Sequence, residues 1–273
     1  MTIPFPEVDR VIYKNNPIVE LICEFRFPRI LSINEKAPVE FQEKIRSSYP
    51  IYKVAIGHQG QVTIEMPANS VDAPTTRLSQ SEKIKNYQFY SADRNWRINL
   101  TSTSFSVSTQ KYERWEEFLP KIDELLKVFE DTYKPAFYER IGLKYVDAFQ
   151  KSKLNFDNTV NWGELIEPQA VGYFAEHKLT PFIKNYVSTV EIDIGDGALA
   201  QIQTFLAETN NVKKDKSVRQ PETVFIIASD LFYFRKELED TKTALEYLHS
   251  VAYRLLRSII TKKLHDAMRP EEI

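Results

Sequence analysis

Short turns separate most of the segments in which apolar and polar residues alternate, and this arrangement limits what the chain can fold into. Alternation with a period of two predicts a β-strand with one buried face. Strands joined by short turns pair antiparallel, because a parallel pair requires a long crossover connection. The clearest segment, "PIVELICEFRFP", has Val19, Leu21, Cys23, Phe25 and Phe27 on one face and Glu20, Glu24 and Arg26 on the other. Cys23 is therefore interpreted as a small core residue rather than a nucleophile.

Further strands are expected wherever similar patterns recur between turn residues. The expected ranges are 51–57, 61–67, 75–80, a meander over 86–110, then 136–149, 172–180, 184–194, 198–208 and 222–234. "GHQG" at 57–60 and "GDG" at 195–197 are typical of hairpin loops. The polar stretch 209–221 contains the densest basic run, "KKDK", and predicts a long loop.

Helical periodicity occurs in three segments. The first covers about 34–49, with Asn34 as a candidate cap and Pro38 in the first turn. The second, Tyr112 to Glu130, carries one apolar stripe that stays in phase across Pro120, which favours one kinked helix over two separate ones. The third runs from a cap at Asp240 or Thr241 to about residue 268.

These elements predict an α+β protein made of two related halves, each a mainly antiparallel sheet packed on a long amphipathic helix. The halves are residues 1–150 and 151–273, and they can pack as one unit. The boundary lies in 150–170, where periodicity is weak and only "NWGELI" resembles a short helix.

Composition excludes several classes of protein. The net charge is -2 and glycine occurs only 7 times, with no GxGxxG or GxxxxGK[ST] motif, so a Rossmann or P-loop nucleotide site is not expected. The near-neutral charge argues against nucleic acid as a partner. There is one cysteine, no run of about 18 apolar residues and no apolar leader, so we expect a cytoplasmic protein without a membrane span.

No sequence motif indicates catalysis or metal binding. The histidines His58, His177, His249 and His265 lack ligand spacing, and neither GxSxG nor SxxK occurs. Glu191, Asp193 and Asp196 are interpreted as a polar strand face and a turn. We therefore expect no metal and no cofactor, assign no catalytic residue, and favour a non-enzymatic function.

The charged residues Glu24, Arg26, Arg140 and Lys144 form the candidate binding site. They lie on the polar faces of two predicted strands, and if those strands are neighbours, cross-strand charge pairs will form. Such pairs are usually solvated surface ion pairs worth about 0–1 kcal/mol. The alternative is a recognition surface for a partner or an anionic ligand.

Two stretches carry a resemblance to a known family: "NPIVELICEFRF" at 16–27 and residues 112–149, which include Arg140 to Tyr145, "RIGLKY". They resemble an uncharacterised, sporadically distributed family of bacterial proteins. The resemblance brings no established activity. It implies an accessory gene, of the kind found in mobile or defence-associated clusters.

Two functional hypotheses follow. The first is a non-catalytic protein-interaction component that acts with a protein partner or as a homo-oligomer, supported by the absence of motifs and by 17 Phe and 14 Tyr residues. The second is a small-ligand-binding domain, or an unrecognised enzyme, with an aromatic-lined pocket between sheet and helix. A cavity with convergent polar groups favours the second, and a filled core with a large exposed apolar patch favours the first.

Overall fold

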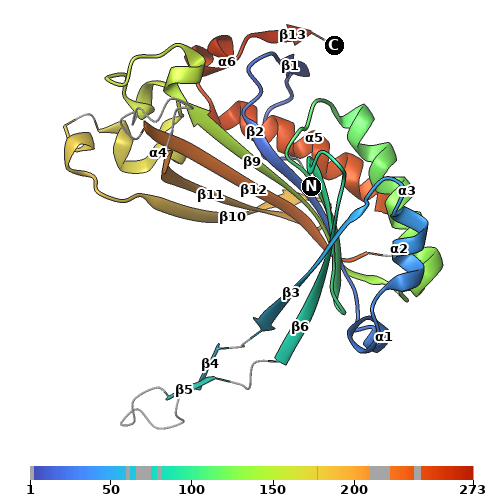
Figure 1. Cartoon of the computed structure of the whole chain (residues 1–273). Helices are drawn as coiled ribbons and strands as arrows, with labels where there is room; N and C mark the ends of the chain where they lie inside the picture. Colours follow the sequence, from blue (N-terminus) through green and yellow to red (C-terminus); the bar gives the residue numbers. More distant parts are fainter. Residues whose placement is uncertain are drawn as a thin grey trace, which may run out of the picture.

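The computed structural model describes residues 3–59, 62–65, 75–78, 82–176, 178–209, 222–236 and 241–272. They form an α+β protein around a nine-stranded antiparallel sheet with the strand order β10-β11-β12-β9-β2-β8-β7-β6-β3 (Figure 1). Its strands, in chain order, are β2 (Ile18–Arg26), β3 (Ile51–Gln59), β6 (Glu82–Tyr90), β7 (Trp96–Leu100), β8 (Ser104–Thr109), β9 (Tyr138–Gln150), β10 (Val187–Gly195), β11 (Ala198–Thr209) and β12 (Glu222–Lys236).

Two smaller sheets accompany the large one. In the first, β1 (Val11–Tyr13) pairs with β13 (Pro270–Glu272), and in the second, β4 (Val62–Glu65) pairs with β5 (Thr75–Leu78). The β1–β13 pair lies beside one end of α5 in Figure 1, so the segment that leads into β2 is held close to that helix.

The helices described here cover one face of the large sheet. They are α1 (Leu31–Glu35), α2 (Val39–Ile45), α3 (Trp115–Tyr133), α4 (Pro168–Val171), α5 (Thr241–Ile259), α6 (Lys262–Ala267) and the 3₁₀ turns η1 (Lys151–Leu154), η2 (Trp162–Glu164), η3 (Gly172–Ala175) and η4 (Thr180–Phe182). Figure 1 shows α2, α3 and α5 on the same side of the sheet. We call the opposite side, which bears Glu24, Arg140 and Asp230, the open face.

Burial follows the alternation of the strands and the stripe of the helix. Leu21, Cys23 and Phe25 of β2 are fully buried on the helix side, as the sequence predicts. The α3 stripe is also buried throughout: Trp115, Phe118, Leu119, Ile122, Leu125, Leu126 and Phe129. A second core cluster, around Trp162, Phe174 and Phe225, lies under the segment 151–183 and the end of α5.

Several sequence predictions need correction. Val19 is 44% exposed instead of buried, because the pairing of β2 with β9 shifts register between Ile18 and Glu20. The expected helix over 34–49 is two short helices, and Asn34 lies inside α1 rather than at a cap. Pro38 is the N-cap residue of α2, and a proline disfavours helical geometry at the residue before it.

The region after residue 150 also differs from its prediction. The described residues of 172–180 do not form a strand: Gly172–Ala175 are the turn η3, Thr180 begins η4, and Gly172 has a φ of 54°. The last expected helix ends at Ile259, after which Thr261 caps the separate helix α6 by accepting from the Leu264 amide. The prediction of two related halves is not confirmed, since strands from both join in one sheet.

Two further predictions are confirmed. Residues 115–133 form one helix that contains Pro120, and the "GDG" segment joins β10 to β11. The expected loop over 209–221 lies, from residue 210 on, outside the described residues, as do Gly60 of the "GHQG" turn and the candidate cap Asp240. None of the described helices is both long enough and apolar enough to span a membrane.

Candidate functional site

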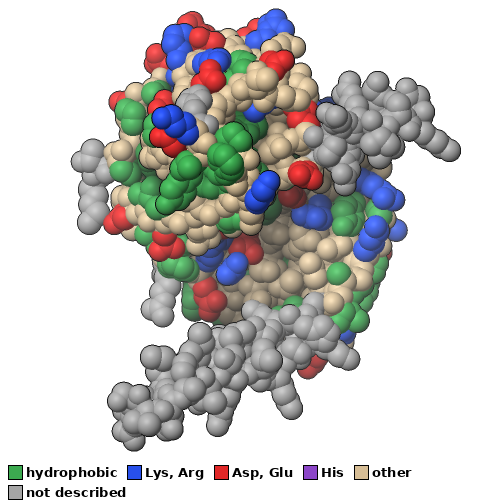
Figure 2. Space-filling view, turned by 90° about the vertical axis from the view of Figure 1, so that its left-hand side faces the viewer, with side chains coloured by type: hydrophobic (Ala, Val, Ile, Leu, Met, Phe, Trp, Pro, Cys, Tyr) green, Lys and Arg blue, Asp and Glu red, His purple; other side chains and the backbone are tan. Residues whose placement is uncertain are grey.

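The open face of the large sheet is not covered by any of the described helices. Figure 2 looks onto it and shows a hollow coloured mainly as backbone and uncharged polar atoms, with Lys, Arg, Asp and Glu side chains grouped beside it. Its strands place hydroxyl, amide and charged side chains outward, because the alternate positions are used for the core. Since every second residue of each strand packs in the core, the residues between them are the ones that this surface presents.

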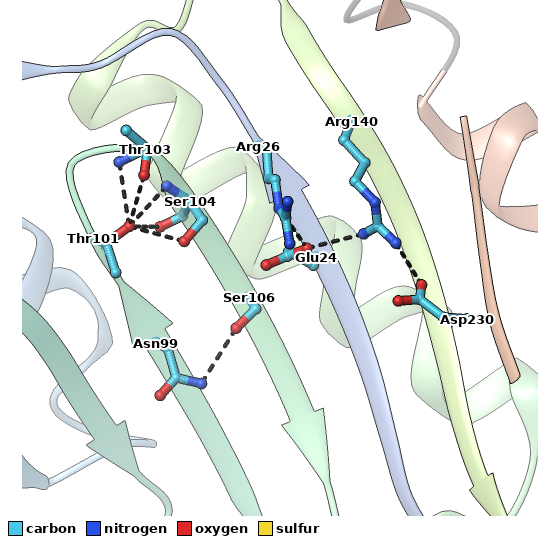
Figure 3. Close-up of polar contacts among 9 residues, drawn as sticks. All are labelled: Glu24, Arg26, Asn99, Thr101, Thr103, Ser104, Ser106, Arg140 and Asp230. Atoms are coloured by element: carbon cyan, nitrogen blue, oxygen red, sulfur yellow. Dashed lines mark hydrogen bonds and ion pairs between the residues drawn. The ribbon is translucent and has the colours of Figure 1, made fainter. Parts of the chain in front are cut away.

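Arg140 of β9 is the centre of the charged group on this face (Figure 3). Its Nη1 donates to Glu24 Oε2 at 2.9 Å, and its Nη2 donates to Asp230 Oδ1 at 2.5 Å. The guanidinium carbon also lies 4.3 Å from the centre of the Phe232 ring. Although it stands on an uncovered face, Arg140 is only 7% exposed. Charge-assisted hydrogen bonds on both sides and an aromatic ring hold this guanidinium in one position.

Gly142 provides the space that Arg140 occupies. A Cβ atom at position 142 would overlap the Arg140 guanidinium, with Nη1 the nearest atom. Residues 140 and 142 share one face of the strand, so a glycine two residues on lets the long side chain lie flat against the sheet. This explains the local sequence "RIG" at 140–142 in physical terms.

Arg26 and Lys144 add positive charge around this centre. Arg26 Nε donates to Glu24 Oε2 at 2.9 Å, the same oxygen that accepts from Arg140. Lys144 lies opposite Asp230 in the β9–β12 register, but its ammonium forms no ion pair with any described residue. Three cations therefore surround two carboxylates, which leaves one net positive charge on this part of the open face.

Uncharged polar side chains continue the surface over β7 and β8. Asn99 Nδ2 donates to Ser106 Oγ at 3.2 Å, and Thr101 Oγ1 accepts from the Thr103 and Ser104 amides at the turn (Figure 3). Farther along β7, Arg97 donates to Glu20 Oε1 at 2.8 Å. The open face thus carries the Arg140 group at β9 and β12, and over β7 and β8 it presents hydroxyl and amide groups together with one further ion pair, Arg97 with Glu20.

The structure brings most of the predicted binding residues together. The strands of Glu24 and Arg140 are neighbours as the prediction required, and Arg26 joins them through Glu24. Lys144 is on the same strand as Arg140 but does not enter their network. Sequence reasoning missed Asp230 and Phe232, although both lie in the predicted strand 222–234 and Asp230 is a charged residue within an apolar run.

A second polar group was also missed, and it lies on the helix side of the sheet. Asp147 of β9 is 3% exposed, and His249 of α5 is stacked on Trp115 with ring centres 4.2 Å apart. The alternation that buries Leu143, Tyr145 and Phe149 also puts Asp147 on the apolar face, so a period-two count can identify it as a buried carboxyl.

Metal-ligand clusters and the single cysteine bear on the chemistry that the described residues can perform. Among the residues that the structure describes, no three His, Cys, Asp or Glu side chains cluster as metal ligands. Cys23 is buried, and burial raises the pKa of its thiol well above the usual value. A protonated and inaccessible thiol is a poor nucleophile, so Cys23 is a core residue.

No protein-family model matches this chain, and no curated protein matches it.

Proposed function

We propose that the chain is a non-catalytic component of a protein complex and binds its partner on the open face. The family resemblance at 16–27 and 112–149 extends the proposal to an accessory bacterial gene cluster, of the defence-associated kind, that also encodes the partner. The observation that carries the proposal is the fixed guanidinium of Arg140, held between Glu24 and Asp230 on a face of the sheet that no described helix covers.

The net positive charge of the Arg140 group indicates that the partner's binding surface is acidic. Arg26 is 56% exposed at its side chain and shares its carboxylate with Arg140, and Lys144 has no ion-pair partner among described residues. An acidic segment of a partner protein would neutralise this excess. Electrostatic complementarity of this kind mainly sets specificity and the association rate.

Aromatic residues next to the charges support the same proposal. Phe234 is 60% exposed and lies 5.1 Å from Phe232 between ring centres, in an edge-to-face arrangement. Arginine and the aromatic residues, including phenylalanine, are enriched in protein interfaces relative to the rest of the surface. The expected interface therefore centres on β9 and β12.

The test is affinity capture of the tagged protein co-expressed with the products of its neighbouring genes. We expect a stoichiometric protein to co-purify, and Lys144→Glu to weaken its binding at least tenfold. Lys127→Glu is the matched control, because it makes the same charge change on α3, on the covered side of the sheet.

Circular dichroism and thermal unfolding must show that both variants are folded. If no partner co-purifies with the wild-type protein, or if Lys144→Glu and Lys127→Glu retain it equally, the open face is not the binding surface and the proposal fails.

A further inference from the structure

A cavity of about 80 Å³ lies on the opposite side of the sheet from the open face. It is partly open and is lined by the N-terminal segment around β1, by β9 and by α5, with four tyrosines: Tyr13, Tyr112, Tyr145 and Tyr253. A water molecule needs roughly 10–15 Å³ of such space. The cavity therefore has room for several waters or for a ligand of a few non-hydrogen atoms.

A buried carboxyl without a partner forms part of this cavity. Asp147 is 3% exposed, and its Oδ1 accepts no hydrogen bond within the described part of the chain. Burial raises the pKa of this carboxyl to about 7. Buried polar atoms in folded proteins are nearly always paired, since an unpaired one costs about 1–3 kcal/mol. The carboxyl is therefore available to a group that enters the cavity.

His249 supplies a second unpaired atom. Its Nδ1 lies 2.8 Å from the Tyr145 hydroxyl, and its Nε2 is buried without a partner among the described residues. Burial, with a smaller effect of Arg10, lowers the pKa of this imidazole to about 3, so the ring is neutral near pH 7. With its proton on Nδ1, the ring donates to Tyr145 and leaves Nε2 as an acceptor.

We propose that this cavity binds a small primary amine in its protonated form. An ammonium group has three N–H donors, which match Asp147 Oδ1, His249 Nε2 and the hydroxyl of Ser229, the residue opposite Tyr145 on β12. The surrounding tyrosine rings stabilise a cation through their electron-rich faces. This inference is independent of the proposed function, because the two sites are on opposite faces of the sheet.

The positive charge beside the cavity does not favour an anion instead. Arg10 Nη1 and Nη2 donate to both carboxylate oxygens of Glu116, at 2.6 and 3.1 Å. Arg114 likewise pairs with Glu117 at 3.3 Å. Both guanidinium groups are therefore neutralised by carboxylates, whereas Asp147 forms no ion pair with any cation among the described residues.

The test uses ethylamine as the probe, in phosphate buffer at pH 8 without Tris, which is itself a primary amine. Backbone amide shifts from proton–nitrogen NMR report binding, with ethanol and acetate as the neutral and anionic probes of similar size. We expect saturable shifts in β9 and α5 with ethylamine alone. Asp147→Asn should weaken binding at least tenfold, and Asp131→Asn, the same change at an exposed position of α3, should have no effect.

A pH series on the unchanged protein provides a second measurement. The titratable groups around Asp147 are Arg10, Tyr13, Tyr112, Glu113, Arg114, Tyr145, His249 and Tyr253. Affinity for ethylamine should fall as pH decreases from 8 to 5.5, since Asp147 becomes protonated while the amine stays charged.

Three results would overturn the proposal: no saturable binding of ethylamine, equal binding by ethanol or acetate, or unchanged binding by folded Asp147→Asn. If that variant does not fold, affinity that stays constant between pH 8 and 5.5 overturns it. The cavity would then be a hydrated space in the core.

Discussion

At the scale of single residues, Gly142 determines whether the charged centre of the open face can form. The Arg140 guanidinium occupies the space that any larger residue at 142 would need. Without that position, Glu24 and Asp230 would lose their shared cation. Glycine at position 142 is thus a requirement of the site, although it makes no side-chain contact itself.

We expect Gly142→Ala to lower the free energy of unfolding by about 1–3 kcal/mol, because it displaces Arg140 from its hydrogen bonds to Glu24 and Asp230, of which only Glu24 keeps another cation, Arg26. Urea denaturation measures the loss. The control is the same change in an Arg140→Met background, where alanine should instead be neutral or stabilising by about 0.5 kcal/mol, since glycine is unfavourable in a strand. Equal losses in both backgrounds would contradict the explanation.

Asp147 and His249 have opposite effects on how stability depends on pH. The pKa of Asp147 is raised from 3.8 to about 7, so the folded chain keeps a proton that the unfolded chain loses, and stability falls as pH rises through this window. The pKa of His249 is lowered from 6.5 to about 3, so the unfolded chain holds the extra proton and stability rises with pH. Between about pH 4 and 6.5 the two contributions nearly cancel.

Removing one of the two titratable groups should expose the effect of the other on the pH dependence of stability. We expect the stability of Asp147→Asn, measured by urea denaturation at pH 4.5, 5.5 and 6.5, to rise with pH by about 1 kcal/mol per unit relative to wild type. His249→Gln should show the opposite slope. If both variants follow the wild-type curve in parallel, these groups do not titrate as burial requires.

At the scale of elements, α3 shows what a helix stripe can and cannot reveal. The in-phase stripe correctly predicts one helix through Pro120, because the burial of seven apolar residues outweighs one lost hydrogen bond. Such a stripe cannot reveal where a helix ends because a segment distant in the sequence packs against it. The helix α5 ends at Ile259 where the isolated bridge between Ile166 and Ile260 joins it to a segment far away in the sequence.

We expect Pro120→Ala to leave the fold intact and to keep or raise stability, by up to about 2 kcal/mol. Pro120 is exposed on the outer side of α3, and alanine restores the missing N–H donor without changing the buried stripe. The gain is limited because alanine also increases the freedom of the unfolded chain. Thermal unfolding followed by circular dichroism tests this, and gross unfolding of the variant would contradict the interpretation of Pro120 as a packing feature.

At the scale of the whole molecule, the sequence predicts which face of its strand a residue lies on, but it does not predict which strands are neighbours in the sheet. Alternation identifies Glu24 and Arg140 as residues on polar strand faces, yet the placement of β2 between β8 and β9 depends on contacts between distant segments. The charged centre combines β2, β9 and β12, and the cavity combines β1, β9 and α5. Neither site is contiguous in the sequence, so only the strand order could reveal them.

The segment "RIGLKY" contributes residues to both sites, because successive side chains of a strand point to opposite faces of the sheet. Arg140, Gly142 and Lys144 face the open side, whereas Leu143 and Tyr145 face the helices, with Tyr145 lining the cavity. The other segment that carries the family resemblance contributes in the same way, since Asn16 and Pro17 line the cavity and Glu24 belongs to the charged centre.

The central position of β2 also has a consequence for synthesis of the chain. Its partners, β8 and β9, begin at Ser104 and Tyr138, so both edges of β2 stay unpaired until much later residues have emerged. At about 5–20 residues per second, that delay lasts on the order of ten seconds. During this interval Leu21, Cys23 and Phe25 have no core to enter, and an apolar strand with open edges is prone to pair with other chains. The pairing of β2 on both edges is therefore one of the late steps in closing the sheet during synthesis.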